Sequence, residues 1–144
     1  MGKKRIVTQD TGQAVKATPT RAAAAISKKK LFSGIVYIQA TYNNTKIVLT
    51  DEAGNVILWS SSGALGFTGT KRGTPFAASK VAEWLVDRAA ALGLKEVAVV
   101  VKGVGAGRES ALRTLGARGL VISSIKDATP IPFNGPRAPK PRRV

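Results

Sequence analysis

The sequence contains no cysteine and no histidine, and these two absences exclude several classes of chemistry. Without thiols the chain can form no disulfide and has no thiol nucleophile. Without imidazole it cannot build a catalytic triad that depends on histidine. The usual zinc sites combine the same two residue types and are excluded as well. We therefore expect no metal site and no cofactor.

Long apolar runs are also missing. No stretch approaches the roughly 20 consecutive apolar residues that a membrane-spanning helix needs. The N-terminus is basic, but it lacks the apolar core of a secretory signal peptide. We expect a cytoplasmic protein that makes no contact with a membrane.

Acidic residues are scarce: 8 Asp and Glu stand against 23 Lys and Arg, which gives a formal net charge of +15. The excess is concentrated at the two ends of the chain. Residues 1–30 carry eight basic residues and one acidic residue, and residues 128–144 carry four basic residues and no acidic one. A field of this sign attracts polyanions, and nucleic acid is the commonest polyanionic partner.

The composition along the chain predicts one folded domain with two extensions. A length of 144 residues fits a single domain with its own core. Residues 1–30 lack a sustained apolar pattern and are expected to form an extended basic arm. Residues 31–127 are expected to form an α/β RNA-binding domain. Residues 128–144 contain five prolines and are expected to form a stiff, basic tail that joins no sheet interior.

Within the domain, hydrophobic periodicity predicts a run of strands followed by alternating helices and strands. Asn43 and Asn44 lie at a predicted hairpin turn. Residues 61–73 form a long loop that contains Lys71, Arg72 and Gly73, and a loop of this length is often functional. Thr74 and Pro75 are typical of a helix start, and Gly93 of a helix end. The expected strands span 35–42, 46–51, 55–61, 96–101 and 120–126, and the expected helices span 75–92 and 107–115.

The segment "KGVGAGRE" at 102–109 places three glycines between a predicted buried strand and a helix, as phosphate-binding loops do. A nucleoside-triphosphate loop would need Lys followed by Ser or Thr after a glycine, and that pair is missing. A dinucleotide fingerprint fits Gly103, Gly105 and Gly107 with Asp127 as the distal acid, but the third glycine comes one residue early. A third interpretation is a main-chain nest for nucleic-acid phosphates.

The nest interpretation fits the surrounding charge best. Glycines allow main-chain N–H groups to turn toward an anion, and a helix N-terminus adds its dipole. Lys102 and Arg108 bracket the loop, while Arg113 and Arg118 continue the positive charge along the helix and beyond it. The plainer alternative is a tight strand-to-helix turn with solvated cations. Together with the two basic ends, the pattern favours phosphate binding.

Several longer motifs carry a family resemblance. The segments "YNNTKIVLTDEAGN", "GFTGTKRGTPFAA", "VKGVGAGRESALRTL" and "IKDATPIPFNG", followed by "PRAPKPRRV", are similar in content and order to bacterial small-subunit ribosomal protein eleven. The similarity extends from Gly34 to Val144. Two positions depart from the family pattern, since Phe133 stands where histidine is common and Pro136 where cysteine is common. An aromatic ring at 133 could stack on a base.

The resemblance implies a three-layer α/β/α domain related to the ribonuclease H-like fold, with a five-stranded mixed sheet in the order 3-2-1-4-5. It also implies a place on the platform of the small subunit, where the family bridges ribosomal RNA helices. The implied neighbours are small-subunit ribosomal proteins seven and eighteen and the messenger RNA near the Shine–Dalgarno helix, whose cleft the family helps to form. The first predicted strand carries no carboxylate, so the two-metal site of a nuclease is not expected.

These observations predict a structural RNA-binding protein of the small ribosomal subunit, active in translation, with no catalytic residue and no small-molecule substrate. The alternatives are a histone-like nonspecific DNA-binding protein and, third, a dinucleotide-dependent enzyme. The residues expected to contact RNA are Asn43, Asn44, Lys71, Arg72, Gly73, Lys102, Gly103, Gly105, Gly107, Arg108, Arg113, Asn134, Arg137, Lys140, Arg142 and Arg143.

Overall fold

The computed structural model describes residues 31–143, so the predicted arm of residues 1–30 lies outside the described residues. Each strand and α-helix expected from the sequence is present, with ends that shift by one or two residues. In chain order the elements are β1 (Ser33–Ala40), β2 (Thr45–Thr50), β3 (Val56–Ser61), η2 (Gly69–Gly73), α1 (Pro75–Ala91), β4 (Glu96–Lys102), α2 (Gly107–Ala117) and β5 (Val121–Asp127).

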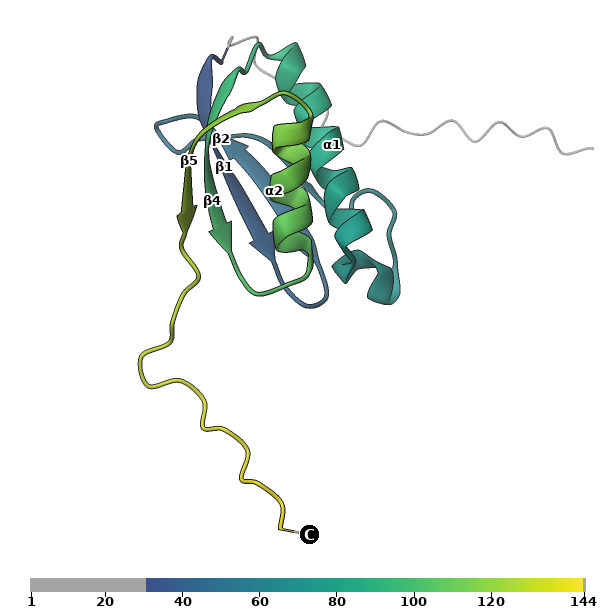
Figure 1. The fold of residues 1–144 in the computed structure, drawn as a ribbon, viewed down its shortest axis with the longest axis vertical. Helices are drawn as coiled ribbons and strands as arrows, with labels where there is room; N and C mark the ends of the chain where they lie inside the picture. Colours follow the sequence, from purple (N-terminus) through teal and green to yellow (C-terminus); the bar gives the residue numbers. More distant parts are fainter. Residues whose placement is uncertain (1–30, 144) are drawn as a thin grey trace, which may run out of the picture.

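The strands form one mixed sheet in the order β3-β2-β1-β4-β5 (Figure 1). The antiparallel hairpins β1–β2 and β2–β3 form one half of the sheet. β4 pairs in parallel with both β1 and β5, so the other half is a parallel sheet. The α/β class and the strand order 3-2-1-4-5 implied by the resemblance are confirmed.

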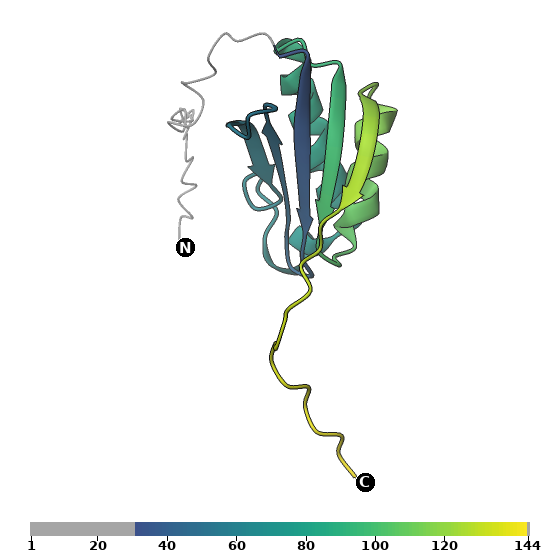
Figure 2. The ribbon, with the colours of Figure 1, turned by 90° about the vertical axis from the view of Figure 1, so that its left-hand side faces the viewer.

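Both helices pack on the same face of this sheet (Figures 1 and 2). The strands alternate, so Val36 and Ile38 of β1 and Val99 of β4 point into the core and are fully buried. α1 contributes Leu85 and a face of small residues, which allows the helix to lie close to the strands. The opposite face of the sheet is covered by no helix of residues 31–143.

The start of α1 follows from the Thr74-Pro75 pair, as the sequence predicts. The Thr74 hydroxyl accepts a hydrogen bond from the backbone N–H of Ala77 at 3.3 Å, and Pro75 occupies the first helical position. The helix ends at Ala91, and Gly93 adopts a φ of 84° just beyond it. No helix within the described residues is long and apolar enough to cross a membrane.

The packing of α2 predicts opposite effects for two glycine-to-alanine substitutions in the same helix. A Cβ at Gly107 would overlap Thr45 Oγ1 and lie 2.8 Å from Ala78 Cβ, whereas a Cβ at Gly116 would meet only Ile122 Cδ1, at 3.8 Å. Gly107→Ala should therefore lower the free energy of unfolding by about 1–3 kcal/mol. Gly116→Ala should raise it by up to about 1 kcal/mol through helix propensity. Urea unfolding of both variants checks this, and equal effects of the two would contradict the packing.

Candidate nucleic-acid interface

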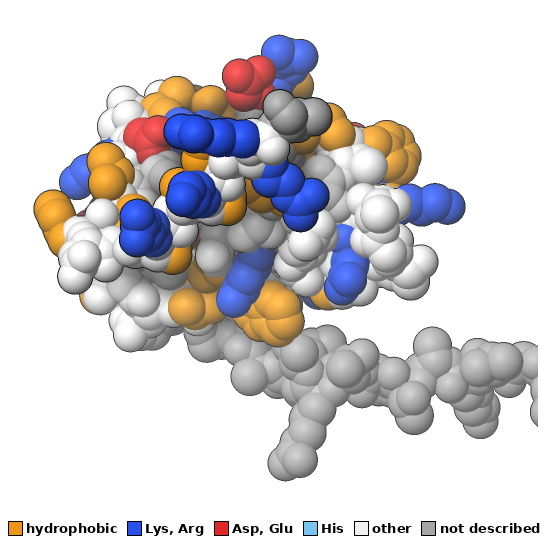
Figure 3. All heavy atoms as spheres, turned by 90° about the horizontal axis from the view of Figure 1, so that it is seen from below, with side chains coloured by type: hydrophobic (Ala, Val, Ile, Leu, Met, Phe, Trp, Pro, Cys, Tyr) orange, Lys and Arg blue, Asp and Glu red, His pale blue; other side chains and the backbone are white. Residues whose placement is uncertain are grey.

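Four separate segments meet at the end of the sheet where β1 and β4 finish. They are the β1–β2 turn (residues 41–44), η2, the glycine loop (residues 103–106) and the start of the tail at Ala128 and Thr129; we call this region the basic end. Figure 1 shows them at the lower end of the folded domain, above most of the tail. Figure 3 views this end together with the tail that leaves it, and Lys and Arg side chains far outnumber acidic ones there. Carboxyl ends of parallel strands are the usual ligand-binding edge of an α/β sheet.

Gly73 brings η2 against the β1–β2 turn. A Cβ at this position would collide with the carbonyl oxygen of Tyr42 and lie 3.4 Å from Asn43 Cα. Because only glycine permits this approach, the cations of η2 are held beside Asn43 and Asn44. Lys71 and Arg72 are both exposed, and neither forms an ion pair within residues 31–143. The sequence predicted this segment as an irregular loop, and its 3₁₀ turn was not expected.

The glycine loop packs on the same turn from the other side. Gly103 has a φ of 93°, and a Cβ there would collide with the carbonyl oxygen of Ala40. A Cβ at Gly105 would collide with the carbonyl oxygen of Thr41, although the φ of Gly105 is not positive. The steric need for these glycines therefore arises from contact with β1 and its turn. A close approach to a ligand is not needed to explain them.

Internal hydrogen bonds also limit how many main-chain N–H groups of the glycine loop are available for the predicted phosphate nest. Gly105 N–H donates to the Ala40 carbonyl at 3.0 Å, and Gly103 N–H donates to Thr129 Oγ1 at 3.2 Å. The N–H groups of Val104 and Ala106 donate to no acceptor in the part of the chain that the structure describes. Both residues are exposed, and α2 begins next to them without a side-chain cap. An anion at this loop would be held by these two amides and the helix dipole.

Arg108 is engaged in an internal network that the sequence did not predict. Its Nη2 donates to Asp127 Oδ2 at 2.6 Å, and its Nη1 donates to the Gly103 carbonyl at 3.2 Å. Thr129 donates both its N–H and its hydroxyl to Asp127 Oδ1. Hydrogen bonds from Arg108 and then from Thr129 hold the pKa of Asp127 far below its usual range. The network joins α2, the glycine loop and the first residues of the tail.

Two ion pairs, one in this network and one between the end of α2 and α1, change the interpretation of Asp127 and Arg118. Asp127, the candidate ribose ligand of the dinucleotide interpretation, is already paired with Arg108. Arg118 is paired in turn with Glu83 at 3.1 Å and with Asp87 at 3.7 Å, both on α1. Its charge therefore does not continue the positive surface of the glycine loop.

The other predicted residues lie in three places: the basic end, the middle of α2 and the tail. Lys102 is exposed at the end of β4 and belongs to the basic end, whereas Arg113 is exposed between one and two turns further along α2. The tail extends away from β5 with no strand or helix in residues 128–143 (Figure 1). Its exposed members are Asn134, Arg137, Lys140, Arg142 and Arg143. Phe133 is 98% exposed, which leaves its ring available for stacking.

Two exposed side chains at the basic end were missed by the sequence analysis. Tyr42 is 79% exposed at the β1–β2 turn, and Val104 is 64% exposed at the tip of the glycine loop. Tyr42 directly precedes the Asn43-Asn44 pair, and an aromatic beside a polar turn is the signal that could have identified it. Val104 carries no comparable signal.

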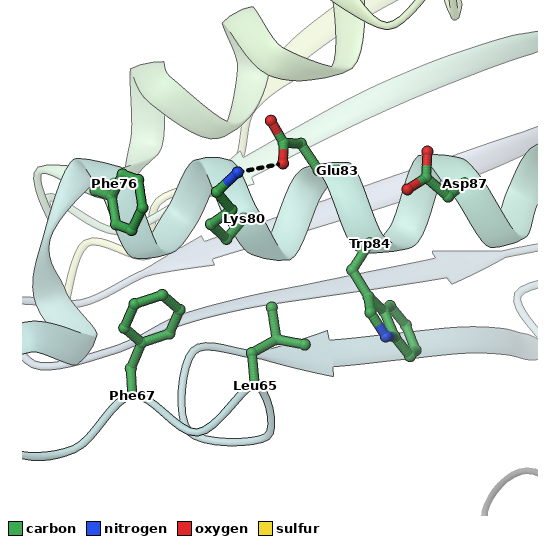
Figure 4. A pocket seen from close by; sticks show the side chains of 7 residues that line it. All are labelled: Leu65, Phe67, Phe76, Lys80, Glu83, Trp84 and Asp87. Carbon is green, nitrogen blue, oxygen red and sulfur yellow. Dashed lines mark hydrogen bonds and ion pairs between the residues drawn. The ribbon is translucent and has the colours of Figure 1, made fainter.

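A groove of about 470 Å³ lies between α1 and residues 65–67, next to η2 (Figure 4). Phe67 and Phe76 meet edge to face on its wall, with ring centres 6.1 Å apart. Trp84 lies further along α1 under the Arg88 guanidinium, 3.9 Å from the ring centre. No group of three potential metal ligands occurs anywhere in residues 31–143. Nothing in the groove suggests catalysis.

The Arg108–Asp127 pair predicts a change in titration. In Arg108→Gln the largest cause of the lowered Asp127 pKa is removed, so this pKa should rise toward its ordinary value while Thr129 retains part of the shift. The lowered pKa stabilises the folded protein above the ordinary Asp value of about 3.9, and this stabilisation is lost as the pH falls through the depressed value. The stability gap between parent and variant should therefore close under strongly acidic conditions.

Carboxyl-carbon NMR titration of Asp127 measures the shift directly. Asp51 is the internal control, because its lowered pKa comes from hydrogen bonds with Asn55 and should not respond to the substitution. An unchanged Asp127 titration in Arg108→Gln would show that the ion pair does not form in solution.

Comparison with known proteins agrees with the resemblance noted in the sequence. The family model described as Ribosomal protein S11 matches residues 34–143. Small ribosomal subunit protein uS11 of Treponema pallidum subsp. pallidum and that of Treponema pallidum strain Nichols are each 58% identical to this chain over 117 residues. The aligned region covers 81% of this chain and 93% of each relative. The chain therefore belongs to the ribosomal protein S11 family, and it is a structural protein of the small ribosomal subunit rather than an enzyme.

Proposed function

We propose that this chain binds small-subunit ribosomal RNA through two surfaces, the basic end and the tail. The observation that carries the proposal is the packing of η2 and the glycine loop on the β1–β2 turn. This packing gathers Lys71, Arg72 and Lys102, the two free amides and the polar turn into one surface. Such a surface can follow the shape of a folded RNA while its cations neutralise phosphates.

In this proposal the tail contributes cations on an extended chain that can contact RNA beyond the domain. Its cations are separated by prolines, which keep the chain extended and limit the entropy lost when it lies along RNA. We place the boundaries of the RNA-binding domain at residues 31–127, with residues 1–30 as an N-terminal arm and residues 128–144 as the tail. Both extensions carry a strong excess of basic residues, which suits segments that pass between RNA helices.

The position within the ribosome is proposed from the family resemblance. We infer that the protein lies on the platform of the small subunit in the cytoplasm and bridges RNA helices there. Its neighbours would be small-subunit ribosomal proteins seven and eighteen. The messenger RNA would pass nearby, where the protein helps to form the cleft for the Shine–Dalgarno helix.

Co-sedimentation tests the proposal against the nonspecific DNA-binding alternative. A tagged copy of the chain expressed in bacteria should migrate with small ribosomal subunits through a sucrose gradient in high salt. A nonspecific basic protein would be stripped under these conditions, because its affinity falls steeply with salt. Release of the chain from small subunits, with retention on DNA of any sequence, would reject the ribosomal proposal.

Charge removal at the basic end should change the salt dependence of RNA binding. Lys71→Gln combined with Arg72→Gln should weaken binding to a small-subunit platform RNA fragment. The slope of log K against log salt should flatten by about 0.7 to 0.9 for each phosphate that the variant no longer neutralises. Arg142→Gln combined with Arg143→Gln should have a similar effect on the slope. The measurement is a salt series of binding isotherms for each variant.

The matched control is Arg88→Gln combined with Arg118→Gln. It removes the same charge, but Arg88 lies on Trp84 and Arg118 pairs with the carboxylates of α1. The slope for the control should stay at the parent value. Equal flattening by all three double variants would mean that net charge alone sets the affinity and that the basic end is not a specific contact surface.

A further inference from the structure

The face of the sheet opposite the helices carries aromatic rings and lysines but no helix of residues 31–143. Figure 2 shows this face toward the viewer, with both helices behind it. The strand register places Tyr37 of β1 level with Val48 of β2 and Val100 of β4, and Val48 level with Trp59 of β3. These residues alternate with the buried core positions and so point to the open face. Trp59 is 50% exposed.

Lysines flank the two rings on the side nearest the basic end. Gln39 of β1 is level with Lys46 on one side and with Lys102 on the other. Lys46 Nζ lies 5.6 Å from the centre of the Trp59 ring, and Lys102 Nζ lies 6.0 Å from the centre of the Tyr37 ring. Lys126 of β5 is level with Val100 and adds a third cation to this face. Rings and cations thus alternate across β3, β2, β1 and β4, and β5 adds one more lysine at the end of the row.

Charge on the open face is polarised along the strands. The three lysines lie in the half that adjoins the basic end. The carboxylate that the register assigns to this face, Glu96, lies at the opposite end of β4, level with Ser33. Glu52 is also at that far end, where it accepts a hydrogen bond from the Ser33 hydroxyl. The half with the rings therefore complements a polyanion, and it is continuous with the basic end.

We propose that this half-face, defined by Tyr37, Trp59, Lys46, Lys102 and Lys126, binds unpaired RNA bases. The inference rests on the proposed function and adds a second contact surface to it. Unpaired bases would stack on the two rings, and the lysines would turn from the rings to the adjoining phosphates. Trp59 is the more exposed of the two rings, and Tyr37 is half-buried. An open sheet with aromatics between cations is a recurrent platform for single-stranded RNA, because every base offers a π face.

The test uses the full chain and two RNA probes, a single strand of mixed sequence with about twelve nucleotides and a duplex of the same length. Tyr37→Leu and Trp59→Leu keep apolar bulk but remove the stacking surface. Each should lower affinity for the single strand at least about fivefold. Neither removes charge, so the salt slope and the affinity for the duplex should stay at the parent values. Phe76→Leu is the matched control, since this ring is 63% exposed but belongs to α1.

Fluorescence gives a second readout, because the chain has only two tryptophans. In Trp84→Phe the signal comes from Trp59 alone, and the single strand should quench it to saturation. In Trp59→Phe the remaining Trp84 signal should hardly respond. Circular dichroism and thermal unfolding check that each variant is folded. If Trp59→Leu does not fold, Trp84→Phe still tests the inference, because it keeps both rings of the proposed surface.

Three outcomes would overturn the inference, and they are distinguishable. If acrylamide cannot reach Trp59 in the free protein, another part of the chain or a second copy covers the face. If the leucine variants bind the single strand like the parent while the parent binds platform RNA, the open face is no binding surface and the proposed function stands. If the parent fails to bind platform RNA, the proposed function itself fails, and this inference fails with it.

Discussion

Main-chain contact at Gly73 and Gly105 is the constraint on which the basic end depends. At both positions a side chain would collide with a carbonyl oxygen of the β1–β2 turn, at Tyr42 and Thr41 respectively. Two loops that are about thirty residues apart in sequence are thereby fixed on one turn. Because the main chains touch directly at both glycines, these contacts determine where the cations of both loops lie. The surface that we propose for RNA is in this sense a product of internal packing.

Ion pairs within the domain determine which cations are available to an anionic ligand. Arg108 and Arg118 are paired with carboxylates, and both pairs join elements that are distant in the chain. Surface ion pairs contribute little to stability, but they do neutralise the charge that would otherwise face a ligand. Lys71, Arg72 and Lys102 form no such pair within residues 31–143. The cations of the basic end that can meet an anion are therefore those without a carboxylate neighbour, and net charge alone would not reveal them.

Most of the fold could be predicted from local sequence, because its signals are local. Alternation of apolar residues identified the strands, and Thr74-Pro75 and Gly93 identified the two ends of α1. Motif order supplied the family and with it the strand order. Features that depend on contacts between distant residues were missed. The Arg108–Asp127 pair joins residues 19 apart, and the reason for glycine at 105 lies in Thr41. Neither pair of partners falls within the windows of about 11–18 residues in which hydrophobic periodicity is read.

The anchoring of the tail connects the two proposed modes of RNA binding. Ala128 N–H donates to the Val101 carbonyl at 2.9 Å, and Thr129 is held by Asp127 and Gly103, so the tail leaves β5 from a fixed point beside the glycine loop. In the proposed complex, docking of the basic end on RNA would confine the tail cations to the neighbouring RNA backbone. Their binding is then intramolecular, with a high effective concentration that a free peptide of the same composition would lack. Prolines keep the tail extended and therefore restrict the directions in which it can lie. The hydrogen bonds that hold Thr129 thus determine which part of the neighbouring RNA the tail cations can reach.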